Sequence, residues 1–233
     1  MNRQTSSPPA QEKQISAYGL QRRNMLKFFG ASAAIITIGS ACSDDDPTPA
    51  PPGSGGVNLG TGDIGILNYA YALEQLEAAF YVQVASSFYS GITATEQAFL
   101  TDIRDHEVAH REFFKAALGA NAIGALQVDF SSINFGSRAS VLGAAKVFED
   151  LGVAAYNGAG KLLVSDVFLG LAGKIVSVEA RHAATIRELL AVNTFADTTD
   201  ANALDPAMTP PQVLAAADTY IVTSINASNL PTS

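Results

Sequence analysis

Apolar residues recur at a helical period in four long segments of the chain. In the first segment, residues 63–87, they are spaced three or four positions apart, and neither Pro nor Gly interrupts residues 66–90. These apolar positions are Ile66, Tyr69, Ala70, Leu73, Leu76, Phe80 and Val84. Such spacing places side chains on one face of an α-helix, so the pattern predicts a first helix.

A capping pattern opens the second predicted helix. The sequence Thr93-Ala94-Thr95-Glu96 puts a hydroxyl and a carboxylate three positions apart, where each can accept a hydrogen bond from the other's backbone N–H. The helix is predicted to reach about Leu118 and to end at Gly119, a residue common just after helices. Residues 119–137 are irregular, and this connection is long enough to return along a bundle.

Two further helical segments complete a predicted four-helix bundle. The third helix is expected to start near Ser137 or Ser140 and to run to about Tyr156. The fourth covers roughly residues 166–191. Because the second connection is long, the third helix need not lie antiparallel beside the second. The predicted bundle, residues 63–192, is therefore all-α.

Residues 193–233 are predicted to form a C-terminal extension with one short helix. Thr209 is a suitable N-cap, and Pro210 at the first helical position has its φ angle already set for a helix. This fifth helix is expected to end near Ser224.

Residues 1–41 have the organisation of an export signal. Arg22 and Arg23 precede an apolar stretch, residues 28–41, which is too short to span a bilayer. The sequence Arg-Arg-Asn-Met-Leu-Lys resembles the twin-arginine signal, although Met25 stands where that family prefers Phe. The alternative is an ordinary secretory signal with a basic start.

Cys42 follows Ile38-Gly39-Ser40-Ala41, which resembles the cleavage box of bacterial lipoproteins, with Gly39 where Leu is usual. The resemblance implies a lipid anchor at Cys42 and a periplasmic or outer-membrane, cell-surface location. The alternative is an incidental cysteine near a peptidase site. Residues 42–62 are rich in Pro and Gly and are predicted to be a tether that buries no core.

Charge and cysteine content exclude several functions. The formal net charge is −8, and residues 1–41 contribute five basic side chains and one acidic, which leaves −12 for the remainder. An acidic body argues against nucleic acid as a partner and favours metal cations. Cys42 is the only cysteine, so the chain can form neither an intramolecular disulfide nor a cysteine-ligated zinc or iron–sulfur site.

Two of the three histidines occur in the same short pattern. Glu107 precedes His110 by three positions in the second helix, and Glu179 precedes His182 likewise in the fourth. Residues three apart share one face of a helix. Each pair can therefore present a carboxylate and an imidazole to the same point.

The first and third helices each place a glutamate in an apolar segment, and these segments resemble each other. Glu74 is followed seven positions later by Tyr81, and Glu149 by Tyr156. The chain thus contains two copies of the pattern Glu…Tyr…Glu-x-x-His.

Residues 63–192 therefore resemble the ferritin-like superfamily, in particular the branch related to plant desiccation-related proteins. The resemblance implies two iron or manganese ions and neither haem nor an iron–sulfur cluster. Tyr81 matches a family tyrosine, with a role in redox chemistry or in supporting a ligand. The implied metal ligands are Glu74, Glu107, His110, Glu149, Glu179 and His182.

Four further positions are weaker candidates for the site. Glu77 lies one turn from Glu74 and is an alternative or additional ligand, but the repeat favours Glu74 because Gly152 matches Glu77. His106 points about 100° away from Glu107 around the helix, which predicts a surface or supporting position.

Asp102 and Asp150 are candidates for orienting a ligand histidine by a hydrogen bond.

Two divalent cations would neutralise four carboxylates, and imidazole suits iron, manganese or zinc. The leading hypothesis is an exported protein that oxidises Fe(II) or reduces O2 or peroxide, as a ferroxidase, peroxidase or manganese catalase does. The alternative is a non-enzymatic, desiccation-related stress or surface protein that binds metal without turnover. A zinc-holding protein is a third possibility, and a homo-oligomer is compatible with each.

Overall fold

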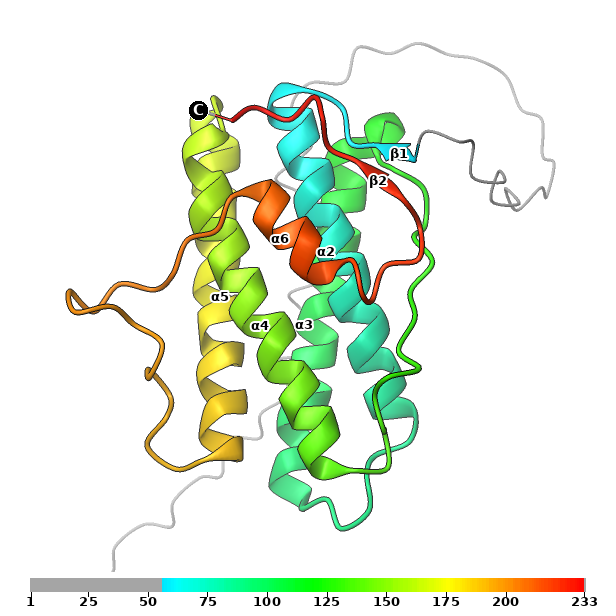
Figure 1. The fold of residues 1–233 in the computed structure, drawn as a ribbon, viewed down its shortest axis with the longest axis vertical. Coiled ribbons are helices and arrows are strands. Elements are labelled where there is room, and N and C mark those ends of the chain that lie inside the picture. The colour runs from blue at the N-terminus through cyan, green and yellow to red at the C-terminus, as the bar shows by residue number, and fades with distance from the viewer. Residues whose placement is uncertain (1–55, 233) are drawn as a thin grey trace, which may run out of the picture. The chain divides into compact units, whose positions relative to one another are not determined.

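The computed structural model describes residues 56–232, so the expected export signal, Cys42 and most of the expected tether lie outside the described residues. Four long helices form a bundle (Figure 1). They are α2 (Gly62–Ser86), α3 (Ala94–Leu118), α4 (Arg138–Ala159) and α5 (Asp166–Leu190). Contacts are most extensive within the pairs α2–α3 and α4–α5. The prediction of an all-α four-helix bundle is confirmed.

The connection from α3 to α4, residues 119–137, runs along the outside of the bundle, so α3 and α4 point the same way (Figure 1). Two polar side chains of α2, Asn68 and Gln75, form hydrogen bonds with the backbone of this connection. The Asn68 amide accepts from Ile123 N and donates to the carbonyl oxygens of Leu59 and Asn121. Gln75 accepts from Leu126 N. These bonds satisfy backbone groups that a packed irregular segment would otherwise bury without partners.

Side chains at the helix starts account for the predicted boundaries. Thr93 and Glu96 form the expected capping box at α3. The hydroxyls of Ser137 and Ser165 accept hydrogen bonds from the first turns of α4 and α5. Gly119 ends α3 with a φ of 54°, which a residue without a Cβ adopts easily.

The C-terminal helix is shorter than predicted. Helix α6 (Pro210–Ala217) starts at the expected cap but ends seven residues before Ser224. Beyond it the backbone pairs with other segments: Val222 N donates to Gln127 O, and β2 (Ile225–Asn226) pairs in parallel with β1 (Val57–Asn58). Several residues here are β-branched, which favours extended backbone over helix.

Strand β1 also changes the expected boundary of the tether. Val57 and Asn58 pair with β2, and the next residue, Leu59, is fully buried in the core. The last residues of the stretch predicted as a tether are therefore part of the folded unit. The apolar side chain of Leu59 packs in the core, which the Pro and Gly content of the stretch did not indicate.

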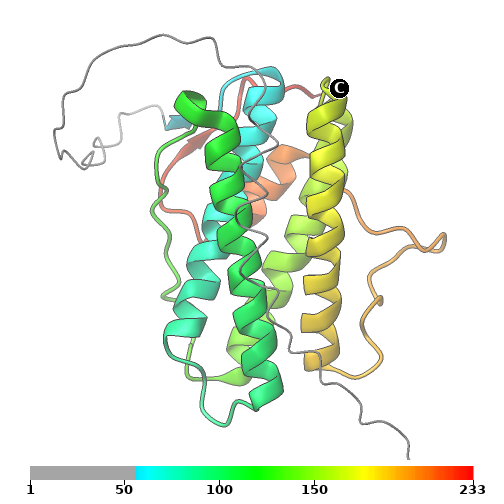
Figure 2. The same ribbon diagram turned by 180° about the vertical axis from the view of Figure 1, so that it is seen from behind.

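Helix α6 and the small sheet cover only one side of the bundle. Helix α6 packs on α4, and seen from behind, α3 and α5 form the side that α6 leaves uncovered (Figure 2). Within residues 56–232 no helix combines the length and apolarity that a membrane span requires.

Candidate metal centre

Four glutamates, one from each long helix, meet inside the bundle. Glu74 of α2, Glu107 of α3, Glu149 of α4 and Glu179 of α5 all have no solvent-exposed surface. The effective penalty for removing one carboxylate from water is several kcal/mol, roughly, unless a nearby charge compensates it. Four such groups in one place therefore need either protons or positive charge beside them.

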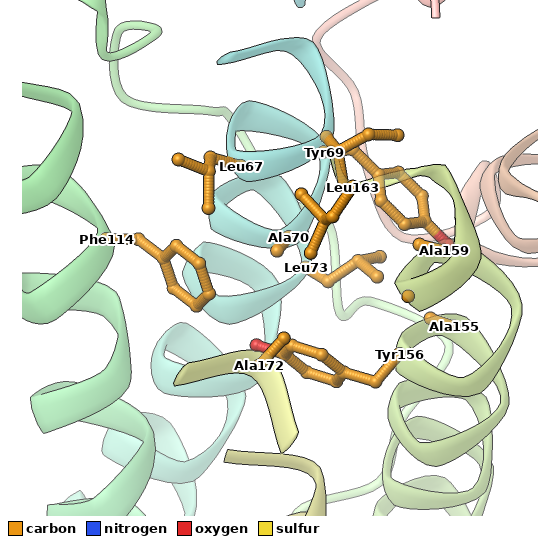
Figure 3. Close-up of a pocket in the computed structure, with 12 residues that line it drawn as sticks. Leu67, Tyr69, Ala70, Leu73, Phe114, Ala155, Tyr156, Ala159, Leu163 and Ala172 are labelled. Atoms are coloured by element: carbon orange, nitrogen blue, oxygen red, sulfur yellow. The ribbon is translucent and has the colours of Figure 1, made fainter. Parts of the chain in front are cut away.

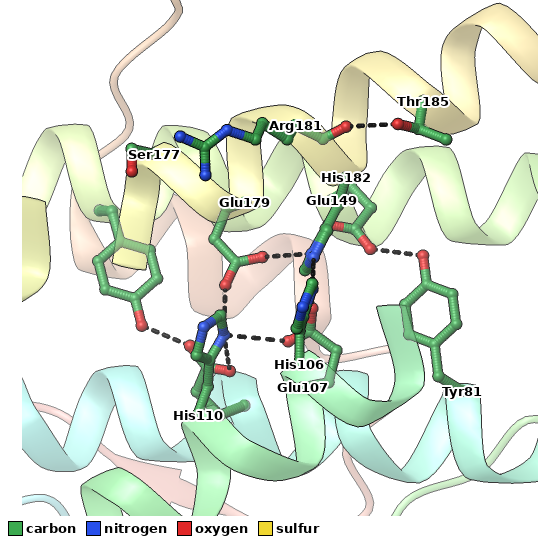
Figure 4. Close-up of polar contacts among 12 residues, drawn as sticks. Tyr81, His106, Glu107, His110, Glu149, Ser177, Glu179, Arg181, His182 and Thr185 are labelled. Atoms are coloured by element: carbon green, nitrogen blue, oxygen red, sulfur yellow. Dashed lines mark hydrogen bonds and ion pairs between the residues drawn. The ribbon is translucent and has the colours of Figure 1, made fainter. Parts of the chain in front are cut away.

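Two histidines complete the cluster, each with its Nδ1 atom facing the carboxylates (Figure 4). His110 Nδ1 lies 2.8 Å from Glu179 Oε1, and His182 Nδ1 lies 2.8 Å from Glu107 Oε1. Each ring thus contacts the glutamate of the facing Glu-x-x-His pair. Glu74 and Glu149 are each 3.5 Å from the nearer imidazole, that of His110 and His182 respectively.

The six side chains form two overlapping groups that share Glu107 and Glu179. In each group, one potential ligand atom per residue lies within 4.8 Å of the others. One group adds Glu74 and His110 to the shared pair, and the other adds Glu149 and His182. The structure therefore brings together all six residues that the sequence indicated. Glu107 and Glu179 belong to both groups, whereas each of the other four side chains belongs to one.

The buried polar atoms of the cluster that form no hydrogen bond are of the kinds that bind metal ions. In the described part of the chain, ten buried side-chain polar atoms lack a hydrogen bond, and eight of them belong to these six residues. They are both carboxylate oxygens of Glu107 and Glu179, one oxygen each of Glu74 and Glu149, and both histidine Nδ1 atoms. Buried polar atoms are nearly always hydrogen-bonded, so this concentration indicates missing cationic partners. Carboxylate and imidazole donors suit iron, manganese or zinc.

Two tyrosines hold the unshared glutamates in a crossed arrangement. The Tyr81 hydroxyl on α2 donates to Glu149 Oε1 at 2.5 Å, and the Tyr156 hydroxyl on α4 donates to Glu74 Oε1. In each case the other oxygen stays free to face the cluster. Tyr156 was not among the predicted site residues, although its place in the repeat matches that of Tyr81.

His106 supports the cluster from outside. Its Nδ1 lies 2.9 Å from His182 Nε2, and the two rings stack with an interplanar angle of 12°. Because His182 turns Nδ1 toward the carboxylates, we assign the ring proton to Nε2, which donates to His106. His106 is exposed, so it connects a buried imidazole with solvent.

The two aspartates considered for this supporting role lie elsewhere in the network. Asp150 accepts hydrogen bonds from Arg187, including one of 2.8 Å from Nε. The charge of Asp102 acts to raise the pKa of His106. Within residues 56–232, however, Asp102 forms no hydrogen bond with His110 or His182. The partner of His182 is therefore His106 rather than a carboxylate.

Glu77 is a fifth buried carboxylate beside the cluster and belongs to neither group. A Cβ atom on Gly152 of α4 would lie 3.0 Å from Glu77 Oε1. The glycine at the position that matches Glu77 in the second copy therefore leaves room for this side chain. Burial, followed by the charge of Glu107, raises the Glu77 pKa well above its usual value.

Protonation of the cluster reflects burial and the two imidazoles. Burial, followed by the charge of Glu179, raises the pKa of Glu107 to about 8. Burial also acts to raise the pKa of Glu179, but contacts with His110 and His182 outweigh it and lower this pKa to about 2. Burial opposes a charged His182, yet its carboxylate neighbours, Glu107 first, raise its pKa to about 12.

Four long helices around a buried cluster of four glutamates and two histidines define the ferritin-like class of helical bundles. The family model of the ferritin-like domain matches residues 62–192, more than half of the chain, and the chain belongs to this family. A comparison with proteins of curated function finds no match to the sequence. The family and the cluster together support a metal-binding function.

The first prediction concerns stability without metal. Glu107 binds its proton more tightly in the folded chain than its usual pKa of 4.5 implies, so stability should fall as the pH rises from 4.5 to about 8. His182 acts in the same direction above pH 6.5, where the unfolded imidazole loses its charge first. Urea denaturation of metal-free protein across this range measures the slope.

The variant Glu107→Gln serves as the control, because it removes one titrating group from the same position. Its slope should be smaller than that of the native protein. Stability that stays constant or rises between pH 4.5 and about 8 would contradict the charge distribution described above.

The second prediction concerns His106. Removing the group that orients a metal-binding histidine typically weakens metal affinity by about 10–100-fold. We expect His106→Ala to weaken the affinity of the Glu149–His182 group for a metal ion by this order and to leave the affinity of the Glu74–His110 group largely unaffected. Titration with Mn(II) followed by calorimetry measures both affinities, and equal weakening of both would contradict the assignment.

Proposed function

We propose that this chain binds two iron or manganese ions at the six-residue cluster and oxidises Fe(II) with O2 or peroxide. The observation that supports this most directly is the pair of overlapping ligand groups, with Glu107 and Glu179 in common. Two divalent cations would neutralise the four carboxylates and leave both imidazoles uncharged. Glu74 and His110 would hold one ion, and Glu149 and His182 the other.

Bound iron or manganese would supply one-electron chemistry toward O2 or peroxide and a coordination position for the oxidant. The protein positions the side chains that would bind the ions. The crossed tyrosine bonds hold Glu74 and Glu149 at their outer oxygens, so each inner oxygen faces the cluster. Burial, followed by the Glu149 charge, raises the Tyr81 pKa well above its usual value, so this phenol keeps its proton and remains a donor.

A non-enzymatic function is the second candidate. The four carboxylates have no exposed surface, and the side chain of His110, the more exposed histidine, is 13% exposed. Such enclosure also suits ions that remain bound without turnover, as in a desiccation-related stress or surface protein. Metal content alone cannot separate the two candidates, but turnover can.

The third prediction tests these functions. Native protein purified from its own compartment should contain two iron or manganese ions per chain by elemental analysis. Anaerobic loading with Fe(II) followed by O2 or peroxide should yield Fe(III) absorbance over repeated cycles. The double variant Glu107→Gln, Glu179→Gln should lose both metal and turnover, because it removes the charge of both shared carboxylates.

Glu112→Gln is the matched control, since Glu112 lies on the same helix as Glu107 but is exposed and pairs with Arg111. Two ions without repeated turnover would support the non-enzymatic function. One zinc ion per chain would support the zinc-holding alternative, and native protein without metal would contradict all three.

We also propose that residues 1–41 export the protein and that Cys42 carries a lipid anchor, which would place the bundle in the periplasm or at the cell surface. The support is the sequence pattern around Arg22, Arg23 and Cys42. The fourth prediction is that cells fed a labelled fatty acid incorporate label into the native chain. Cys42→Ala should remain unlabelled and leave the membrane fraction, whereas equal labelling of both would contradict the anchor.

A further inference from the structure

The two halves of the cluster have different surroundings, although the repeat makes their ligands alike. The half with Glu149 and His182 borders aromatic rings and the exposed His106. Phe80 packs edge-on against both Tyr81 and Phe148, with ring centroids 5.0 Å apart in each pair. The half with Glu74 and His110 borders a cavity instead. The two halves therefore differ in their surroundings, and a small molecule has space only beside the Glu74–His110 half.

This cavity lies between α2, α3, α4 and the start of α5 (Figure 3). Leu73, which precedes Glu74, and Phe114, one turn beyond His110, form part of its wall. Tyr156 also lines it, and the hydroxyl of this tyrosine binds Glu74. The cavity therefore ends one side chain away from the Glu74–His110 half. Of its lining residues, only Gly160, Leu163 and Ala172 are partly exposed, so we infer that the cavity opens beside the α4–α5 connection.

The wall of the cavity is formed almost entirely by apolar atoms, including the rings of Tyr69 and Tyr156. Tyr156 uses its hydroxyl on Glu74, whereas the Tyr69 hydroxyl is buried and has no hydrogen-bond partner in the described part of the chain. The free space amounts to about 20 Å³, enough for one water-sized molecule. A water molecule needs two to four polar partners, which this wall does not offer.

We propose that the cavity binds dioxygen and directs it to the Glu74–His110 half, an inference that rests on the proposed function and names its oxidant. Dioxygen is small, uncharged and apolar, so it enters such a space without giving up strong hydrogen bonds to water. A hydrated metal cation would pay a large desolvation penalty, and hydrogen peroxide would lose most of its hydrogen bonds.

The fifth prediction uses the paramagnetism of dioxygen. Methyl resonances of the full chain, metal-free and zinc-loaded, are recorded under raised O2 pressure. The Leu73 and Ala159 methyls in the cavity should broaden more than those of Val164 and Val192, whose residues are 87% and 76% exposed. Because the metal-free chain is included, this measurement separates a failure of the cavity from a failure of the proposed metal chemistry.

Ala172→Leu fills the mouth of the cavity, and Ala184→Leu adds the same volume at a partly exposed position of the same helix outside it. Ala172→Leu should reduce the excess broadening at Leu73 to the surface level. It should also lower the second-order rate constant for O2 several-fold, with unchanged iron stoichiometry. Ala184→Leu should match the native protein in every measurement.

Two results from the broadening and dioxygen-rate measurements would overturn the proposal. One is Leu73 broadening no greater than that of Val164 in the native chain. The other is an Ala172→Leu variant that keeps the native broadening and the native rate constant for O2. A rate constant for hydrogen peroxide that falls as much as that for O2 would also overturn it, because the cavity would then not discriminate between the oxidants.

Discussion

The mutual repulsion of four buried carboxylates is the constraint on which the rest of this structure depends. Glu74, Glu107, Glu149 and Glu179 come from four different helices and share a space without solvent. A bundle that only minimised its own energy would fill this space with apolar side chains, since replacing buried ionic groups with packed hydrophobic ones is often stabilising. The cluster therefore indicates selection for a bound charge rather than for stability.

The surrounding network arranges the cluster so that its inner faces stay free. Tyr81 and Tyr156 bind outer oxygens across the bundle, so each half of the repeat is held by a side chain from the other half. His106 fixes the ring orientation of His182 from the surface. These bonds occupy the outward-facing atoms, and eight inward-facing atoms form no hydrogen bond. A rigid frame of this kind keeps like charges close before any cation is present.

Much of this arrangement follows from local sequence. The Glu-x-x-His spacing is a property of a single helix, and the repeat of Glu74…Tyr81 as Glu149…Tyr156 identified the partner positions. The repeat could also have identified Tyr156 as a site residue, because Tyr156 follows Glu149 by seven positions, as Tyr81 follows Glu74. Helix starts at Thr93 and Ser137 followed from their capping side chains, which act within one turn.

Features that depend on contacts between distant segments could not be predicted. His106 on α3 contacts His182 on α5. The sequence of α3 predicts which way the His106 side chain points, but not which residue of another helix it contacts. The end of α6 depends on pairing of the following residues with Gln127 and with β1. Likewise, Leu59 looked like part of a tether because the surface that buries it comes from elsewhere in the chain. The cavity beside Glu74 exists only through the packing of several helices.

The one-sided cover by α6 has a consequence for how ions reach the cluster. The helices that bear both Glu-x-x-His pairs, α3 and α5, form the side that α6 does not cover (Figure 2). His110 is the most exposed of the six side chains and lies on α3. Solvent therefore comes closest to the cluster on this side of the bundle, at the His110 imidazole. A cation that binds the cluster would then meet His110 before the four carboxylates, which have no exposed surface.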